Sequence, residues 1–266
     1  YIVETISQNK KNITTYNFTY TYKNFINHLK DNKYDVIFFL SGNPYPQFSE
    51  NKNLLDLELT NIPLLNLLEA IKDTKSNSAL WFSSSVAVYG KTINTLQSEK
   101  DICYPLSKYA VSKLMGEEHV KYYSRVYNLN VGSFRIFSTF GPQLKRQVVY
   151  DIYKKLIKNP NKIKLLGTGY EGRDLCFVEN QVERMYFIAK NVNPNGDIFN
   201  IGSGKLSTIK EIANHMIDIL NTQTIIEFID KKRTFDGIQW IADVSKIKKI
   251  GYEEEEFIYD GLKKTI

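Results

Sequence analysis

The chain has 266 residues, of which 42% are hydrophobic and 24% are charged, and its formal net charge at pH 7 is +6. This composition excludes a disordered or collagen-like chain, and the length suffices for a large buried core without metal or disulfide cross-links. The longest strongly apolar run, Val36–Leu40, is far shorter than the roughly 18 residues of a membrane span, and the scattered lysines match no nucleic-acid-binding signature, so we expect neither a membrane nor a nucleic-acid partner.

The two cysteines, Cys103 and Cys176, stand far apart and show no CxxC or Cys/His spacing. We therefore expect no disulfide framework and no metal site, and we place the protein in the reducing cytoplasm. Cys176 lies in a strand pattern and is expected in the core. For Cys103 two interpretations stay open, an acid/base group in the pocket and a small buried hydrophobe.

Strands and helices alternate in the first half of the chain. The apolar spacing predicts strands at 35–40, 79–82 and 131–137 and helices at 54–71 and 107–127. This alternation predicts an α/β fold with a Rossmann-like, doubly wound parallel sheet, whose ligands bind at the carboxyl ends of the strands.

The pattern becomes irregular after Gly141–Pro142. It predicts helices at 147–158 and 208–220 and strands at 162–166, 174–178 and 224–228. We therefore expect one domain over 1–142 and a smaller α/β lobe over 143–266, and leave open whether 180–200 returns to the first domain.

The most specific pair of side chains is Tyr109 and Lys113, spaced by four residues near the start of a predicted helix. Residues at this spacing share a helix face, so the ammonium can lie near the phenol, favour the phenolate and tune a general acid/base. Ser85, at the end of the preceding strand, could donate a hydrogen bond to a substrate oxygen. Taken alone, the same spacing also suits an ordinary exposed helix face.

Several motifs in order carry a resemblance to a known family. S-S-S-V-A-V-Y-G at 83–90 and P-L-S-K-Y-A-V-S-K at 105–113 resemble the extended short-chain dehydrogenase/reductases, specifically the NAD-dependent epimerase/dehydratase family acting on nucleotide sugars. The further matches are N-L-L-E-A at 66–70, R-I-F-S-T-F-G-P at 135–142, G-R-D-L-C-F-V at 172–178, F-N-I-G-S-G at 199–204 and the segment Arg233–Asp236. The resemblance covers essentially the whole chain.

The resemblance implies a role for each part of the chain. Tyr109 is the acid/base on the sugar hydroxyl, Lys113 tunes it and holds the nicotinamide ribose, Ser85 polarises the same oxygen, and hydride passes between sugar and nicotinamide. The implied cofactor-binding residues are Leu40, Ser41, Gly42, Ser83, Tyr109, Lys113 and Phe137, and the implied substrate-binding residues are Ser85, Ser138, Arg173, Arg233 and Asp236. Residues 1–142 then form the cofactor domain and 143–266 the substrate lobe of a homodimer that uses NAD, with NADP left open.

Departures from the family pattern are informative. The dinucleotide fingerprint G-x-x-G-x-x-G is absent, and residues 1–8 resemble the helix that follows it, so we expect the first strand and glycine loop either to precede Tyr1 or to be truncated. A truncated chain would lack the pyrophosphate site at that helix N-terminus. No acid marks the end of a second strand near 15–17, which leaves NAD against NADP open, and Ser138 replaces the usual Asn.

The residues after Ser85 separate the subclasses. Sugar 4,6-dehydratases carry an acid pair there, whereas this chain has Val86 and Ala87, which cannot transfer protons. We therefore expect a nucleotide-sugar 4-epimerase, with a 4-keto nucleotide-sugar reductase as the alternative enzyme. A non-catalytic dinucleotide-binding protein is the alternative of another class, and the joint presence of Ser85, Tyr109 and Lys113 argues against it. A role in polysaccharide biosynthesis is an expectation from the family alone.

Overall fold

The computed structural model describes residues 2–6, 13–17, 19–43, 46–51, 54–91, 96–229, 239–253 and 257–266. The chain forms two compact units, unit 1 with residues 1–84, 107–133 and 193–197, and unit 2 with residues 85–106, 134–192 and 198–266. The predicted division into a cofactor domain and a substrate lobe concerns which part binds which ligand, and it stays a prediction.

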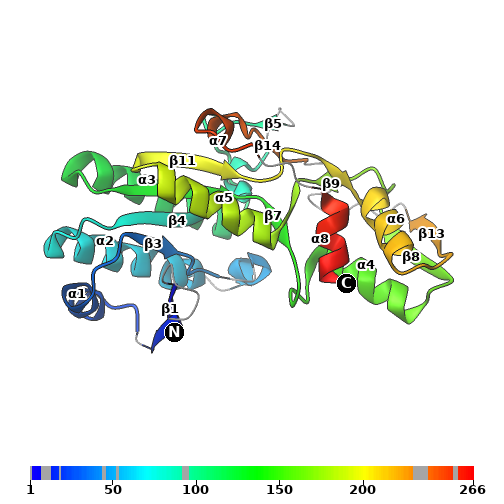
Figure 1. Ribbon diagram of the computed structural model, residues 1–266, viewed down its shortest axis with the longest axis horizontal. Coiled ribbons are helices and arrows are strands. Elements are labelled where there is room, and N and C mark those ends of the chain that lie inside the picture. Colours follow the sequence, from blue (N-terminus) through cyan, green and yellow to red (C-terminus); the bar gives the residue numbers. More distant parts are fainter. Residues whose placement is uncertain are drawn as a thin grey trace. The chain divides into compact units, whose positions relative to one another are not determined.

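A central parallel sheet confirms the predicted Rossmann-like α/β fold (Figure 1). Its strand order is β11-β6-β4-β3, from Asn195–Ile201 (β11), Val131–Ile136 (β6), Ala79–Ser85 (β4) and Val36–Phe39 (β3). β3 and β4 run parallel with Phe39 opposite Phe82. Leu80, Trp81 and Phe82 of β4 are fully buried, which is why this strand is a continuous apolar run rather than an alternating one.

Three helices accompany these strands in unit 1. They are α1 (Tyr22–Asp31), α2 (Ile62–Thr74), which follows the π-helical turn η2 (Leu57–Asn61), and α3 (Lys108–Tyr127), with a short 3₁₀ helix η1 at Pro46–Asn51. The side chain of Ser107 caps α3 by accepting the Ala110 N–H at 3.1 Å. α2 contacts both α1 and α3, and Leu64, Leu68 and Val120 belong to the shared core (Figure 1).

The first residues form strands instead of the predicted helix. β1 (Ile2–Ile6) pairs antiparallel with β2 (Ile13–Asn17) as a two-stranded sheet of its own. The prediction of a helix over 1–8 is therefore wrong. Four of the five β1 residues are the β-branched Ile, Val and Thr, whose restricted side-chain rotamers favour an extended backbone.

Unit 2 is built from short strand pairs and helices. The helices are α4 (Gln147–Lys158), α5 (Val178–Asn191), α6 (Ile209–Ile219), α7 (Ser245–Lys249) and α8 (Ile258–Thr265), with the 3₁₀ turn η3 at Val86–Tyr89. β8 (Lys162–Leu166) pairs parallel with β13 (Ile225–Ile229), and β7 (Ser138–Phe140) pairs parallel with β10 (Leu175–Phe177). The remaining pairs are β5 (Leu96–Gln97) with β14 (Ile241–Ala242), and β9 (Gly172–Arg173) with β12 (Ser207–Thr208).

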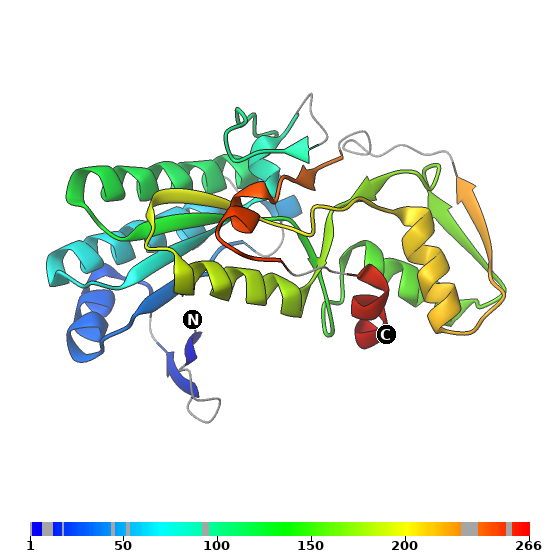
Figure 2. The same cartoon turned by 45° about the horizontal axis from the view of Figure 1, so that its top comes forward.

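The core of unit 2 lies where α4, α6 and β8 meet (Figure 2). Ile152, Ile163, Ile212 and Met216 are buried there. The predicted bounds of α4 and β8 agree with the structure, whereas the predicted strand over 174–178 is shorter because α5 already begins at Val178. Among the helices in the described ranges, none has the length and apolar character needed to cross a membrane.

Candidate functional site

Lys113 is a buried cation on α3 of unit 1. Only 4% of it is exposed, its Nζ donates a hydrogen bond to the carbonyl of Ser83 at 2.7 Å, and it lies 5.0 Å from the ring centre of Phe82. Burial lowers the pKa of Lys113 to about 8, although the negative charge of Asp56 acts to raise it. The ammonium therefore gains or loses its proton close to neutral pH.

Tyr109 lies one helical turn before Lys113. The centre of its half-buried ring is 5.8 Å from Lys113 Nζ, so the structure brings together the two side chains that the sequence paired. In general, a positive charge near a phenol favours its ionised form. The pair can therefore exchange a proton with a bound hydroxyl group.

Gly42 lies beside the ammonium, in the loop that follows β3. A Cβ atom on Gly42 would stand 3.1 Å from both Lys113 Nζ and Thr60 Oγ1, closer than most side-chain contacts allow. The Thr60 hydroxyl is fully buried and, within the described chain, has no hydrogen-bond partner. Of the other predicted cofactor residues here, Leu40 is 61% exposed and Ser41 Oγ donates to the carbonyl of Leu59 at 3.2 Å.

Several buried polar side chains around η2 and α3 were not predicted from the sequence. Asn43 Nδ2 donates to Asp56 Oδ1 at 3.1 Å, and Ser112 Oγ donates to Asn61 Oδ1 at 2.8 Å. All four residues are buried. The signal for them was present as Asp56 and Asn61 within the predicted helix 54–71, because buried polar groups need partners and rarely occur in a core without a reason.

Ser84 and Ser85 at the end of β4 have different partners. Ser84 Oγ donates to the fully buried carboxylate of Glu117 on α3 at 2.5 Å, within unit 1. Ser85 belongs to unit 2, where its half-buried Oγ accepts the Ala87 N–H at 3.2 Å and caps η3. Ser85 is thus held at the start of a defined turn, two residues after the carbonyl that binds Lys113.

A buried hydrogen-bond network in unit 2 supports this turn. Tyr89 donates its hydroxyl proton to Asn200 Oδ1 at 2.7 Å, and the guanidinium of Arg135 lies 4.7 Å from the ring centre of Tyr89. Glu99 accepts the backbone N–H of Asn200 at 2.9 Å. Burial raises the pKa of Tyr89 far above its ordinary value, so this hydroxyl stays a donor.

Asp174 binds the loop at Ser203 and Gly204 of unit 2 through hydrogen bonds. Its carboxylate accepts both the N–H and the hydroxyl of Ser203, at 2.7 and 2.6 Å, together with the N–H groups of Gly204 at 2.9 Å and Ala242 at 3.0 Å. Burial raises the pKa of Asp174, while these donors act to lower it. The motifs at 172–178 and 199–204 are therefore joined through one side chain.

The predicted substrate residues of unit 2 have distinct surroundings. Arg173 is half-buried, donates to the Gly172 carbonyl at 2.9 Å, and lies 5.8 Å from the ring centre of Trp240. Ser138 is half-buried in β7, opposite Leu175. The predicted cofactor residue Phe137 is 3% exposed, while Arg233 and Asp236 lie outside the described residues.

The cysteines differ as well. Cys176 is fully buried in β10, as predicted, and its Sγ accepts a hydrogen bond from Arg184 Nη1 at 2.7 Å. Cys103 is half-buried, with its Sγ 4.0 Å from the carbonyl oxygen of Asp101.

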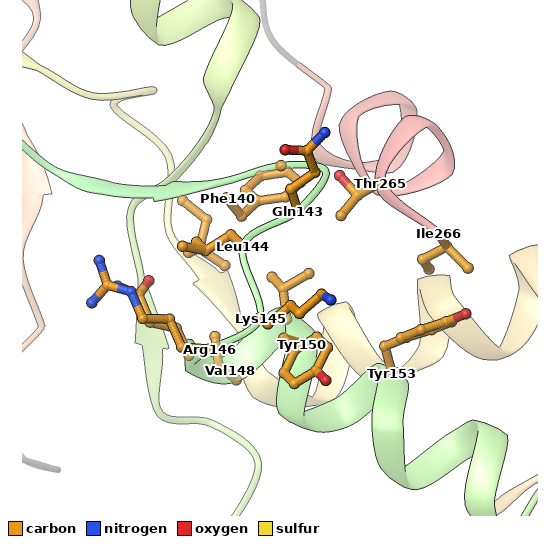
Figure 3. Close-up of a pocket in the computed structure, with 14 residues that line it drawn as sticks. Phe140, Gln143, Leu144, Lys145, Arg146, Val148, Tyr150, Tyr153, Thr265 and Ile266 are labelled. Carbon is orange, nitrogen blue, oxygen red and sulfur yellow. The ribbon is translucent and has the colours of Figure 1, made fainter. Parts of the chain in front are cut away.

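Unit 2 also contains a cavity of 160 Å³ that no predicted site residue lines (Figure 3). Figure 3 shows it between the loop that leads into α4 and the end of α8. Its lining residues are Phe140, Gly141, Gln143, Leu144, Lys145, Arg146, Gln147, Val148, Val149, Tyr150, Tyr153, Leu175, Thr265 and Ile266. It combines an apolar wall with two basic and two tyrosine side chains.

The sequence of this chain is similar to those of a known family and of several characterised proteins. The NAD dependent epimerase/dehydratase family matches residues 4–202. A UDP-glucuronate 4-epimerase of Thermodesulfobacterium geofontis is 28% identical over 76% of this chain and 62% of its own length, and a dTDP-4-dehydro-6-deoxyglucose reductase of Escherichia coli is 29% identical over 70% of this chain and 60% of its own length.

Solved structures show the same fold. A UDP-N-acetylglucosamine 4-epimerase of Methanobrevibacter ruminantium M1 in complex with UDP-N-acetylmuramic acid is 25% identical and superposes with a TM-score of 0.79, over 91% of this chain and 77% of its own. The UDP-glucuronic acid 4-epimerase of Bacillus cereus, solved with UDP-glucuronic acid and NAD, is 24% identical with a TM-score of 0.75, over 90% and 75%. Since the family match spans most of the sequence, this chain belongs to the NAD-dependent epimerase/dehydratase family.

Proposed function

We propose that this protein is an NAD-dependent nucleotide-sugar 4-epimerase that works through Ser85, Tyr109 and Lys113. The observation that carries the proposal is the buried ammonium of Lys113, fixed by the Ser83 carbonyl and one helical turn from Tyr109. A binding protein has no need to bury a cation beside a phenol, whereas an acid/base tyrosine needs one to ionise near neutral pH.

The residues near Lys113 suit the nicotinamide ribose of NAD. An ammonium has three N–H donors, of which one goes to Ser83, so Lys113 can also bind ribose hydroxyl groups. Gly42 leaves room at this point, and the Thr60 hydroxyl, which has no hydrogen-bond partner among the described residues, offers a further polar contact. When bound, NAD supplies the chemistry of accepting a hydride from the sugar C4 and returning it.

The protein's own groups then handle the proton. Tyr109, as phenolate, takes the proton of the C4 hydroxyl during oxidation and gives it back during reduction, and Ser85 donates a hydrogen bond to the same oxygen. Lys113 stabilises the phenolate throughout. Re-reduction from the opposite face inverts C4, with no net change in NAD. Arg173 is suited to the diphosphate because a guanidinium remains charged and can bind two oxygens at once, and we assign Ser138, Arg233 and Asp236 to the same substrate.

A 4-keto nucleotide-sugar reductase is the second candidate function. The relative at 29% identity is a reductase of a 4-dehydro sugar nucleotide, and such an enzyme needs the same proton donor. A dehydratase is disfavoured, since Val86 is buried and neither it nor Ala87 can move a proton.

The test is to incubate the full chain with NAD, or with NADH or NADPH, and a panel of nucleotide sugars and their 4-keto forms, followed by NMR of the sugars and absorbance of the reduced nicotinamide. Interconversion without net cofactor change supports the epimerase. Stoichiometric loss of reduced cofactor with a 4-keto sugar identifies the reductase instead. Bound cofactor without either reaction contradicts both and favours the non-catalytic protein.

A matched pair of variants tests the assignment of Tyr109. We expect Tyr109→Phe to lose turnover by roughly 100-fold or more while cofactor binding is kept, because it removes only the acid/base hydroxyl. Tyr186→Phe is the control, an exposed tyrosine on α5 that should leave turnover unchanged. Full activity in Tyr109→Phe would disprove the assignment.

We also propose that the protein forms a homodimer through α3. Val111, Met115, Tyr122 and Val126 of this helix are exposed, and a second copy of α3 would cover them. Sedimentation velocity of the full chain and of Val126→Glu tests the proposal. A monomer in both cases would contradict it.

A further inference from the structure

We propose that Asp56 supplies the negative charge that balances the buried ammonium of Lys113, and is thereby a positioning residue of the active site. The consequence for turnover rests on the function proposed above. The electrostatic pairing itself rests on the structure of unit 1 alone, and it can be tested without substrate or cofactor.

A hydrogen bond and a close contact hold Asp56 on two sides of the site. Its Oδ1 accepts Asn43 Nδ2 at 3.1 Å, and Asn43 directly follows Gly42, the residue whose absent Cβ makes room beside Lys113 Nζ. Its backbone carbonyl lies 3.4 Å from Ser112 Oγ, whose proton goes to Asn61 Oδ1, and Ser112 directly precedes Lys113. Asp56 therefore contacts both segments that surround the ammonium.

Burial strengthens the electrostatic interaction between Asp56 and Lys113. Asp56 is 5% exposed and Lys113 is 4% exposed, so water screens their interaction far less than it screens a surface pair. A buried cation without a counter-charge tends to give up its proton. The Ser83 carbonyl, which accepts the Lys113 hydrogen bond, is neutral and cannot supply that charge. The negative charge of Asp56 opposes the effect of burial on the pKa of Lys113.

The other groups around Lys113 do not fill this role. From β3 and β4 the neighbours are Gly42, Phe82 and Ser83, none of which titrates. On α3 itself, Tyr109 is the proposed proton carrier, and Glu117 is buried one turn further on, where it accepts the Ser84 hydroxyl. Within the described part of unit 1, Asp56, Lys113 and Glu117 are the buried charged residues, and of the two carboxylates Asp56 is the one that raises the Lys113 pKa.

NMR of protein labelled with ¹³C at the lysine ε-carbon tests the pairing directly. The Lys113 signal is identified by its loss in Lys113→Arg, and its shift is followed from pH 6 to pH 11. We expect Asp56→Asn to move the Lys113 titration midpoint down by about one pH unit, because it removes the balancing charge but keeps the size and the acceptor oxygen of the side chain.

Glu58→Gln is the matched control. Glu58 lies two residues after Asp56 on the same π-helical turn but is exposed, so its removal changes the net charge equally and should leave the Lys113 midpoint in place. An unchanged midpoint in Asp56→Asn, or equal shifts in both variants, would overturn the proposal.

A second measurement covers the case in which Asp56→Asn does not fold. In Lys113→Met the Asp56 carboxylate stays buried without its cation, and ionising it then costs stability. We expect the urea midpoint of Lys113→Met to fall relative to the unsubstituted protein as the pH rises from 4 to 7. A constant difference would contradict the pairing. Since neither experiment measures turnover, their outcome is separate from that of the proposed function.

If the charge pairing and the proposed function are both correct, the pH dependence of turnover should change in Asp56→Asn. The alkaline limb of kcat/KM should move to lower pH in Asp56→Asn, in step with the Lys113 midpoint, whereas a purely structural loss would lower kcat/KM equally at every pH. A uniform loss would mean that Asp56 supports the fold and not the charge of Lys113.

Discussion

Two buried aspartates, one in each unit, show how the same side chain can serve different ends. Asp174 in unit 2 accepts four hydrogen bonds from Ser203, Gly204 and Ala242, which use its available lone pairs and join the segments that carry them. For Asp56 in unit 1 the described residues give one side-chain donor, the amide of Asn43, and the negative charge of Asp56 acts to raise the pKa of Lys113. The number of hydrogen-bond donors around a buried carboxylate thus distinguishes two roles. A carboxylate with many donors holds chain segments together, and one with few donors can balance a nearby positive charge.

The largest expected effect on stability comes from replacing the carboxylate of Asp174. Asp174→Asn replaces an acceptor oxygen by an NH₂ group that faces N–H donors, so at least one buried donor loses its partner. We expect the free energy of unfolding to fall by about 3 kcal/mol, measured by urea denaturation at pH 7. A loss below about 1 kcal/mol would mean that the four hydrogen bonds contribute little, and the contrast with Asp56 would fail.

The next effect is the pH dependence of stability that the buried Lys113 causes. The pKa of Lys113 is about 8 in the folded protein, against about 10.4 for an unperturbed lysine, so between these pH values the unfolded chain binds more protons. Stability should therefore rise with pH across this window, by about 3 kcal/mol for this group alone. Urea denaturation between pH 7.5 and pH 10.5 measures the rise.

Lys113→Met provides the reference for this measurement. It retains the other titrating groups, including Tyr89 and Tyr123, whose raised pKa values have the opposite effect above pH 10. The rise with pH should be present in the unsubstituted protein and absent in the variant. Parallel curves for the two proteins would show that Lys113 is not perturbed by burial.

The contrast also explains how much the sequence could predict. Tyr109 and Lys113 were paired from their spacing because helix geometry fixes which residues share a face, and the structure brings them together. Asp56 was missed because its significance depends on Asn43, which donates to it from the loop that follows β3. Nothing in local spacing reports that contact.

The helices and strands were also predicted best where the local sequence pattern determines them. The strands and helices with strong periodicity, such as β8 and α4, have the predicted bounds, because burial of one face or both determines them. The helix predicted over 1–8 was wrong because it was inferred from the position of the segment in the family pattern and not from its own β-branched residues. Local propensity was the better guide there.

The smallest effect concerns the hydrogen-bond network of Tyr89 and Asn200, next to the turn that Ser85 caps. It tests whether this network holds chain segments together, as Asp174 does. Tyr89→Phe removes the hydroxyl donated to Asn200 but keeps the ring under the Arg135 guanidinium. We expect a loss of about 1 kcal/mol in unfolding free energy, since Asn200 Nδ2 still donates to the Gln97 carbonyl at 2.8 Å. Because the raised pKa keeps the Tyr89 hydroxyl protonated at neutral pH, the loss should be the same at pH 6 and pH 9, as urea denaturation at both values would show. A loss that changed over this range would show that Tyr89 is linked to a titrating group and belongs, like Asp56, with the electrostatic partners.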